Sequence, residues 1–148
     1  MSNTSRGLEI EIVPQDPPRE TGRLVASLPR SSDDNWRTPG WLLDLLFPDG
    51  VFFDPCPINP DGLRESDGMG EWPVDRPIFV NPPYSDPSPW VRRAAEHPGP
   101  IVVLVRVDTS ASWWSYSEAF KVTFIGQRLR FGRARSPAPF ASAIWRKA

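Results

Sequence analysis

The sequence predicts an open α/β fold, in which helices flank a mostly parallel sheet within a minimal single domain. Short apolar segments of strand length alternate along the chain with longer segments that have a helical pattern. The segment 101–107 is apolar enough to be a central strand of a parallel sheet. The 148 residues suffice for one domain with a hydrophobic core but not for two, and the 19 prolines argue against an all-helical bundle.

The N-terminal part is expected to be a flexible tail over residues 1–33, followed by a folded domain over residues 34–148. The tail is rich in serine, proline and charged residues. Within it, residues 8–13 alternate between apolar and charged side chains and could form an edge strand, which Pro14 would end.

The folded domain is expected to begin with a helix at Thr38 and Pro39. A capping hydroxyl followed by proline at the first helical position is a typical helix start, and Pro-Asp-Gly at 48–50 ends the helix. The elements that follow are strands over residues 51–53, 78–80, 101–107, 121–125 and 141–145, with helices over 87–97 and 112–120.

Charge and cysteine usage exclude several classes of protein. The formal net charge is −1, so the chain is not a general binder of polyanions, yet every charged residue from Lys121 onward is a cation. This basic end fits either phosphate contacts or a solvated arginine-rich face. A single cysteine and a single histidine exclude an intramolecular disulfide and give no metal-ligand cluster. With no transmembrane-length segment or signal peptide, we expect an intracellular protein that needs neither a membrane nor a metal.

Polar residues follow two of the predicted strands. Asp54 follows the strand at 51–53, and Asn81 follows the strand at 78–80. In open α/β sheets, ligands bind beyond the carboxyl ends of the strands. The second position begins the run Asn81-Pro82-Pro83-Tyr84.

This run has the groups that a planar amino group requires. The two prolines remove two amide donors and stiffen the turn. The Asn81 side-chain oxygen and the Pro82 carbonyl can then accept the two hydrogens of one NH₂ group, while the Tyr84 ring stacks on the attached base. Accepting both hydrogens favours a tetrahedral nitrogen whose lone pair faces an incoming methyl group, so catalysis comes from orientation and electrostatics without a metal.

Several short features follow one another along most of the chain. They are Trp36-Arg37-Thr38-Pro39, Phe53-Asp54-Pro55-Cys56, Asp67-Gly68-Met69, Phe79 to Tyr84 with Trp90, Asp108-Thr109-Ser110 with Trp113-Trp114, and Gly126 to Phe131. In this order they resemble the phage-encoded DNA N-6-adenine methyltransferases, the small Dam-like enzymes of bacteriophages and prophages. The resemblance begins at about residue 34 and reaches the C-terminus, leaving only the tail unmatched.

The resemblance implies a Rossmann-like methyltransferase fold, S-adenosylmethionine as methyl donor and double-stranded DNA as substrate. The catalytic residues it implies are Asn81, Pro82, Pro83 and Tyr84, which would hold an adenine flipped out of the helix. It also suggests that the enzyme acts in the host cytoplasm and protects viral DNA from restriction.

The resemblance further implies a set of cofactor contacts: Thr38, Pro39, Asp54, Pro55, Asp67 and Asn81. Thr38 and Pro39 would lie near the methionine carboxylate, and Asp67 would face the adenosine half. Many methyltransferases have a glycine-rich turn after the first strand, whereas this chain has Asp54-Pro55-Cys56-Pro57, so the cofactor must contact a different backbone path. Asp61-Gly62-Leu63 is a rival to Asp67-Gly68-Met69 for the adenosine contact.

Candidate DNA contacts are Trp113, Trp114, Arg128 and Arg130. Adjacent tryptophans on a helix point in different directions, so one is expected to pack inward and the other to meet DNA. If residues 128–130 form a strand, the two arginines share one face.

Several alternatives stay open at the level of sequence. They are methylation of cytosine N-4, methylation of a protein glutamine, and an inactive DNA-binding module. GATC is a first guess for the recognition site, with specificity in loops at 61–72 or 128–139. The chain could act as a monomer or as a homodimer.

Overall fold

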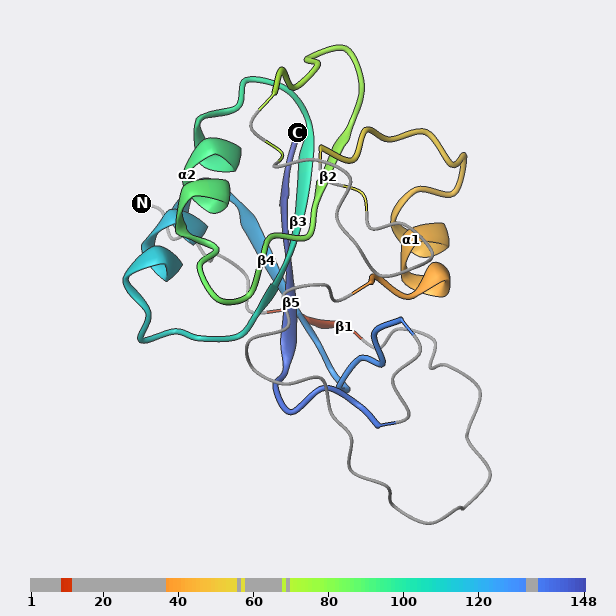
Figure 1. Cartoon of the computed structure of the whole chain (residues 1–148), viewed down its shortest axis with the longest axis vertical. Coiled ribbons are helices and arrows are strands. Elements are labelled where there is room, and N and C mark those ends of the chain that lie inside the picture. Colours follow the sequence, from red (N-terminus) through yellow and green to blue (C-terminus); the bar gives the residue numbers. More distant parts are fainter. Residues whose placement is uncertain (1–8, 12–36, 56, 58–67, 69, 133–135) are drawn as a thin grey trace.

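The computed structural model describes residues 9–11, 37–55, 57, 68, 70–132 and 136–148. At its centre is a five-stranded sheet in the order β1-β4-β5-β3-β2 (Figure 1). The strands are β1 (Glu9–Glu11), β2 (Ile78–Val80), β3 (Ile101–Arg106), β4 (Lys121–Ile125) and β5 (Ser142–Lys147). Beyond β2, Phe53 forms an isolated parallel bridge to Ile78.

The sheet is mixed: four of its five strands run in the same direction, as expected for a mostly parallel sheet, and β5 runs against them. β1 pairs with β4 and β2 with β3 in parallel, but β5 is antiparallel to both of its neighbours, β3 and β4. After β4 the chain turns back and inserts its last strand into the sheet. The first four residues of β5 are buried. A strand buried on both faces has the same continuous apolar pattern in either direction, so the pattern did not reveal the reversal.

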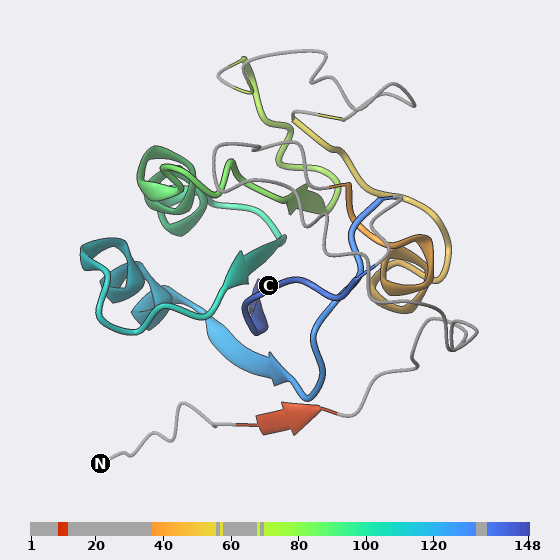
Figure 2. The ribbon, with the colours of Figure 1, turned by 60° about the horizontal axis from the view of Figure 1, so that its bottom comes forward.

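Helices cover both faces of the sheet (Figures 1 and 2). α2 (Ser88–Glu96) and the 3-10 helix η1 (Ser112–Ala119) lie on one face, and α1 (Gly40–Leu46) lies on the other. We call these the α2 face and the α1 face. Because successive strand residues point to opposite faces, Ile78 and Val80 join the core on the α2 face, whereas Phe79 joins the core on the α1 face.

The C-terminal strand is tied to the end of helix α2. Lys147 Nζ donates hydrogen bonds to the carbonyl oxygens of Ala94, Ala95 and His97 at 3.0, 2.9 and 2.6 Å. A cation at this end of a helix also interacts favourably with the helix dipole. Burial lowers the pKa of Lys147, and burial together with the Lys147 charge lowers the pKa of His97 below 6.5.

The predicted strand at 51–53 is reduced to a single paired residue. Val51 is 51% exposed, and its amide donates to Asp49 Oδ1 at 3.0 Å, so the preceding turn extends into it. Phe53 donates to the Pro77 carbonyl at 2.8 Å and accepts from the Phe79 amide at 2.9 Å. The expectation of a three-residue strand was therefore wrong for its first residue, whereas its last residue pairs in parallel with β2.

The other predicted elements are present, with ends that coincide with the prediction or differ from it by at most two residues. The helix predicted at 87–97 is confirmed as α2, in which Trp90, Val91 and Ala94 are buried. The predicted helix at 112–120 is a 3-10 helix over Ser112–Ala119. The possible edge strand is confirmed for Glu9–Glu11, and the rest of the expected tail lies outside the described residues. None of the helices in the described parts of the chain is long and apolar enough to cross a membrane.

Candidate active site

Asn81 and Thr38 meet at the carboxyl end of β2. Asn81 is the first residue after the strand, and its Nδ2 donates a hydrogen bond to Thr38 Oγ1 at 3.0 Å. The two residues are 43 positions apart in the sequence, and both belong to the predicted site. The bond fixes the rotation of the Asn81 amide, with its nitrogen toward Thr38.

This contact corrects the expected role of Thr38 as a helix cap. Helix α1 begins at Gly40 with Pro39 as its N-cap residue, and no side chain caps it. The backbone carbonyl of Pro39 accepts the first helical bonds, from the amides of Leu42 and Leu43 at 3.1 and 3.3 Å. The Thr38 hydroxyl lies one residue too early to cap the helix, and it contacts the end of β2 instead.

Packing on the α1 face brings these segments together. Leu42 of α1 is 1% exposed and belongs to the same buried cluster as Phe79 of β2. Since side chains alternate along a strand, Asn81 lies on the same face as Phe79, which is the face that α1 covers. The Arg37 carbonyl also accepts a hydrogen bond from the Gly132 amide at 2.8 Å, which holds the segment before α1 against the chain after β4.

The Tyr84 ring is part of an aromatic cluster at the site. It is 8% exposed, and its centroid lies 5.8 Å from that of Phe131 and 5.1 Å from that of Phe140, both at interplanar angles of 80°. Edge-to-face contacts of this kind stabilise a defined ring orientation. The sequence did not identify Phe140 as a site residue, because the residue lies 56 positions further along the chain, without helical or strand periodicity linking it to Tyr84.

The two prolines between Asn81 and Tyr84 differ in burial. Pro82 is buried and Pro83 is half-buried, and neither has an amide hydrogen with which to hold the loop. A side chain that the sequence did not single out contacts this loop: Arg106, at the end of β3, donates from a guanidinium nitrogen to the Tyr84 carbonyl.

Asp54 lies on the same edge of the sheet as Asn81. It follows Phe53, whose bridge to β2 is parallel, so both residues leave their strands in the same direction. Asp54 is half-buried and Pro55 is buried. The structure therefore places Thr38 and Asn81 together at the carboxyl end of β2, and Asp54 follows a residue paired in parallel with that strand. That these residues form a ligand site stays a prediction.

The predicted adenosine contact Asp67 and its rival at 61–63 lie outside the described residues. The adjacent Gly68 has a φ of 73°, and a Cβ there would lie 1.8 Å from the Trp90 ring. Its carbonyl accepts a bond from Trp72 Nε1 at 2.9 Å. Only glycine therefore fits at this position, because a side chain would be strained and would collide with Trp90.

The two candidate DNA-contacting tryptophans lie on the α2 face, opposite Asn81. Trp113 is 6% exposed, with its ring centroid 6.0 Å from that of Trp145, so it is a core residue and its proposed DNA contact does not fit. Trp114 is half-buried, stacks on Phe124 at 6.3 Å and meets Trp145 edge-on at 5.1 Å. The expectation that one of the pair packs inward is confirmed for Trp113.

Arg128 and Arg130 do not lie on a strand, because β4 ends at Ile125. Between them, Leu129 is 1% exposed, and its carbonyl accepts a bond from the Ala138 amide at 2.7 Å. Arg128 is exposed and Arg130 is half-buried, so the expectation that they share one face of a strand is wrong.

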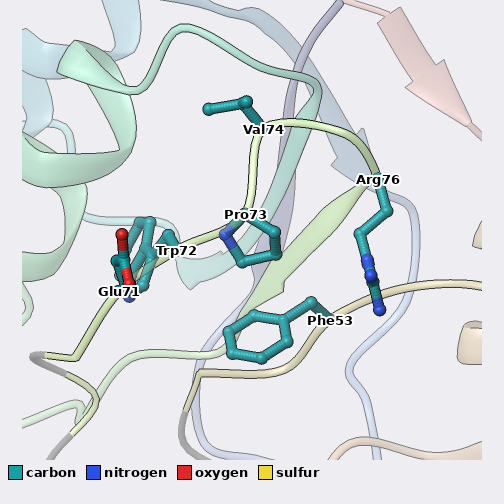
Figure 3. Close-up of a pocket in the computed structure, with 6 residues that line it drawn as sticks. All are labelled: Phe53, Glu71, Trp72, Pro73, Val74 and Arg76. Carbon is teal, nitrogen blue, oxygen red and sulfur yellow. The ribbon is translucent and has the colours of Figure 1, made fainter.

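A pocket of about 520 Å³ lies at the other end of β2 (Figure 3). Its lining residues are Phe53, Glu71, Trp72, Pro73, Val74 and Arg76. Phe53 pairs with Ile78, the first residue of β2, and the strand rises about 10 Å from there to Asn81. Phe53 and Trp72 pack into the core of the α2 face. The lining includes neither Asn81 nor Thr38, but Phe53 directly precedes Asp54, one of the predicted cofactor contacts.

No group of three or more potential metal-ligating side chains occurs among the residues that the structure describes. The chemistry available at the carboxyl edge is that of amide, hydroxyl, carboxylate and carbonyl oxygens beside an aromatic cluster.

Comparison with known proteins gives one result at the level of family. The sequence model described as DNA N-6-adenine-methyltransferase (Dam) matches residues 64–142, more than half of the chain. The matched span includes Asn81, Tyr84 and Arg106 but not Thr38 or Asp54. No curated protein and no solved structure matches the chain.

Proposed function

The chain belongs to the DNA N-6-adenine-methyltransferase (Dam) family, and on this premise we propose that it moves a methyl group from S-adenosylmethionine to the N-6 amine of an adenine flipped out of double-stranded DNA. The observation that carries the proposal is the hydrogen bond from Asn81 Nδ2 to Thr38 Oγ1 at the carboxyl end of β2. It orients the amide on which the proposed chemistry depends.

The Asn81 amide acts on the target amine through its oxygen. With Nδ2 turned toward Thr38, Oδ1 is the end of the amide that accepts a hydrogen from the substrate. The Pro82 carbonyl accepts the second hydrogen, and positive charge that develops on the nitrogen is stabilised by both oxygens. Neither proline has an amide donor that could compete for these acceptors.

The aromatic cluster holds the base. The Tyr84 ring stacks against the flipped adenine, and its contacts with Phe131 and Phe140 set the orientation in which it does so. Stacking compensates part of the cost of removing the base from the DNA helix, since an aromatic contact with one base contributes about 1–3 kcal/mol.

The carboxyl edge suits the methyl donor. Residues that would hold it are Thr38, Pro39, Asp54, Pro55, Asp67 and Asn81. Asp54 is half-buried, so its carboxylate lies at the edge without being enclosed by the core. S-adenosylmethionine supplies an electrophilic methyl group when it is bound. Parallel pairing of Phe53, β2 and β3, with α2 as a crossover helix, supports a Rossmann-like arrangement.

The DNA backbone is expected to meet basic residues near the same site. Arg37 and Arg128 are exposed and Arg130 is half-buried. The hydrogen bond between the Arg37 carbonyl and Gly132 brings their two segments together on the α1 side. Phosphate contacts of this kind weaken with added salt, because releasing counterions into a more concentrated salt solution gains less free energy.

Transfer of labelled methyl from S-adenosylmethionine to unmethylated DNA tests the proposal, with nucleoside analysis of the product. Label in 6-methyladenine supports it, whereas label in 4-methylcytosine would replace adenine with cytosine as the target. Absence of label from folded protein would refute it. Asn81→Ala should lower kcat on the order of 100- to 1,000-fold, as expected when one charge-stabilising group is removed. Asn81→Asp is the matched control, because it keeps oxygen acceptors and should retain more activity than Asn81→Ala.

A further inference from the structure

Arg106 ends a strand that otherwise has only apolar residues. The five preceding residues of β3 are buried, and the Arg106 side chain is 24% exposed at the carboxyl edge. An arginine is not required to complete the sheet at this position. The contacts of its guanidinium group therefore indicate what it does.

Three different groups fix the orientation of this guanidinium. One terminal nitrogen donates to the Tyr84 carbonyl, and the other lies 3.4 Å from Asp108 Oδ2. The guanidinium carbon lies 5.2 Å from the centroid of the Trp113 ring. Arginine is suited to this role because its planar group can donate in two directions while its face rests on an aromatic ring.

The Asp108 carboxylate is itself held by its own turn. Its Oδ1 accepts a hydrogen bond from Ser110 Oγ at 3.3 Å, and its backbone carbonyl accepts one from the Ala111 amide at 3.1 Å. The turn after β3 is thereby linked through Arg106 to the loop after β2.

The loop that Arg106 contacts cannot be held by the amides of Pro82 and Pro83, because proline has none. Two side-chain contacts hold its ends. Asn81, at the start of the loop, bonds to Thr38, and the Tyr84 carbonyl at its end bonds to Arg106. Both ends of the four-residue run are therefore anchored by side chains from other segments.

We infer that Arg106 is a positioning residue, which holds the Tyr84 backbone so that the tyrosine ring and the Pro82 carbonyl meet the target base together. Asp108 and Trp113 fix the guanidinium in the orientation this requires. The inference rests on the proposed function, because it assigns Arg106 an effect on the base and not on the methyl donor.

The test compares Arg106→Gln and Arg106→Lys with the wild-type chain. Loss of the guanidinium should lower kcat on the order of 100-fold, because small displacements of reacting groups have effects of this size, while the KM for S-adenosylmethionine stays the same. Arg106→Lys should recover part of the loss, since an ammonium group can bond to the carbonyl but cannot reproduce the planar fork.

A second readout reports on the base directly. DNA with 2-aminopurine in place of the target adenine gives a fluorescence signal that depends on how this base is stacked. Arg106→Gln should change this signal in the bound complex. Arg92→Gln is the matched control, since Arg92 Nε also lies 3.4 Å from a carboxylate, Glu96 Oε1, but on the exposed side of α2. It should leave kcat and the fluorescence unchanged.

The outcomes separate the two proposals. If the wild-type chain transfers methyl groups and Arg106→Gln transfers them at the same rate, the positioning role alone is overturned. A lower kcat accompanied by an equal loss of affinity for S-adenosylmethionine would also overturn it, because the role would then be general to the fold. No transfer by the folded wild-type chain would overturn the proposed function and this inference together. If Arg106→Gln does not fold, Asp108→Asn replaces it and should lower kcat in the same direction by a smaller factor.

Discussion

Replacing Thr38 with valine removes the hydroxyl that accepts the Asn81 hydrogen bond and preserves the shape of the side chain. The lost bond has a length of 3.0 Å and lies in a half-buried position. A hydrogen bond of this kind contributes about 0.5–1.5 kcal/mol net. If the bond serves to orient the Asn81 amide, its loss should lower kcat about 2- to 12-fold.

The assay is methyl transfer measured for four chains: wild type, Thr38→Val, Asn81→Ala and the double variant. Thr38→Val should reduce kcat less than Asn81→Ala, because valine disturbs the orientation of the amide without removing it. In the double variant, valine should have no further effect, since the amide it would misorient is already absent. Thr123→Val is the control, because Thr123 is also half-buried but lies on β4.

Two results would refute this reasoning. One is an unchanged kcat for Thr38→Val when the bond is known to be lost. The other is an equal loss of activity from Thr38→Val in the presence and absence of the Asn81 side chain, which would show that Thr38 acts independently of the amide.

Two further predictions concern stability. Gly68→Ala should lower the free energy of unfolding by about 2–5 kcal/mol in urea titrations, because its Cβ would collide with Trp90 at a positive φ. Gly70→Ala, where a Cβ meets nothing within 4 Å, should be nearly neutral, and equal losses would contradict the collision. Burial, and then the charge of Lys147, lowers the pKa of His97 below 6.5 in the folded chain. As the pH falls, the imidazole is therefore protonated in the unfolded chain before it is protonated in the folded chain. Stability should therefore decrease as the pH falls through 6.5 toward the folded-state pKa, and His97→Gln should flatten that part of the profile; an identical profile for both chains would exclude His97 as its source.

The sequence predicted the elements whose signals are local. β2, β3 and β4 are short apolar runs bounded by turn residues, and α2 has apolar residues at helical spacing, so each was identified close to its observed ends. The polar residues directly after β2 were predicted to form a site, because the end of an α/β strand is where such sheets bind ligands, and this stays a prediction. The predicted helix cap at Thr38 was wrong, since the preference of a hydroxyl for a helix start was outweighed by a contact with a distant strand.

The sequence by itself determined most of the segments that form strands and helices, and that Asn81 and Tyr84 flank two prolines without amide donors. Only the tertiary structure decided that β5 runs antiparallel within the sheet, that Thr38 orients Asn81, and that Arg106 holds the Tyr84 carbonyl. The physical reason is the distance along the chain over which each interaction acts. Periodicity reports which side of an element is buried, through interactions over a few residues, whereas strand order and side-chain partners depend on the packing of segments that are distant in the chain.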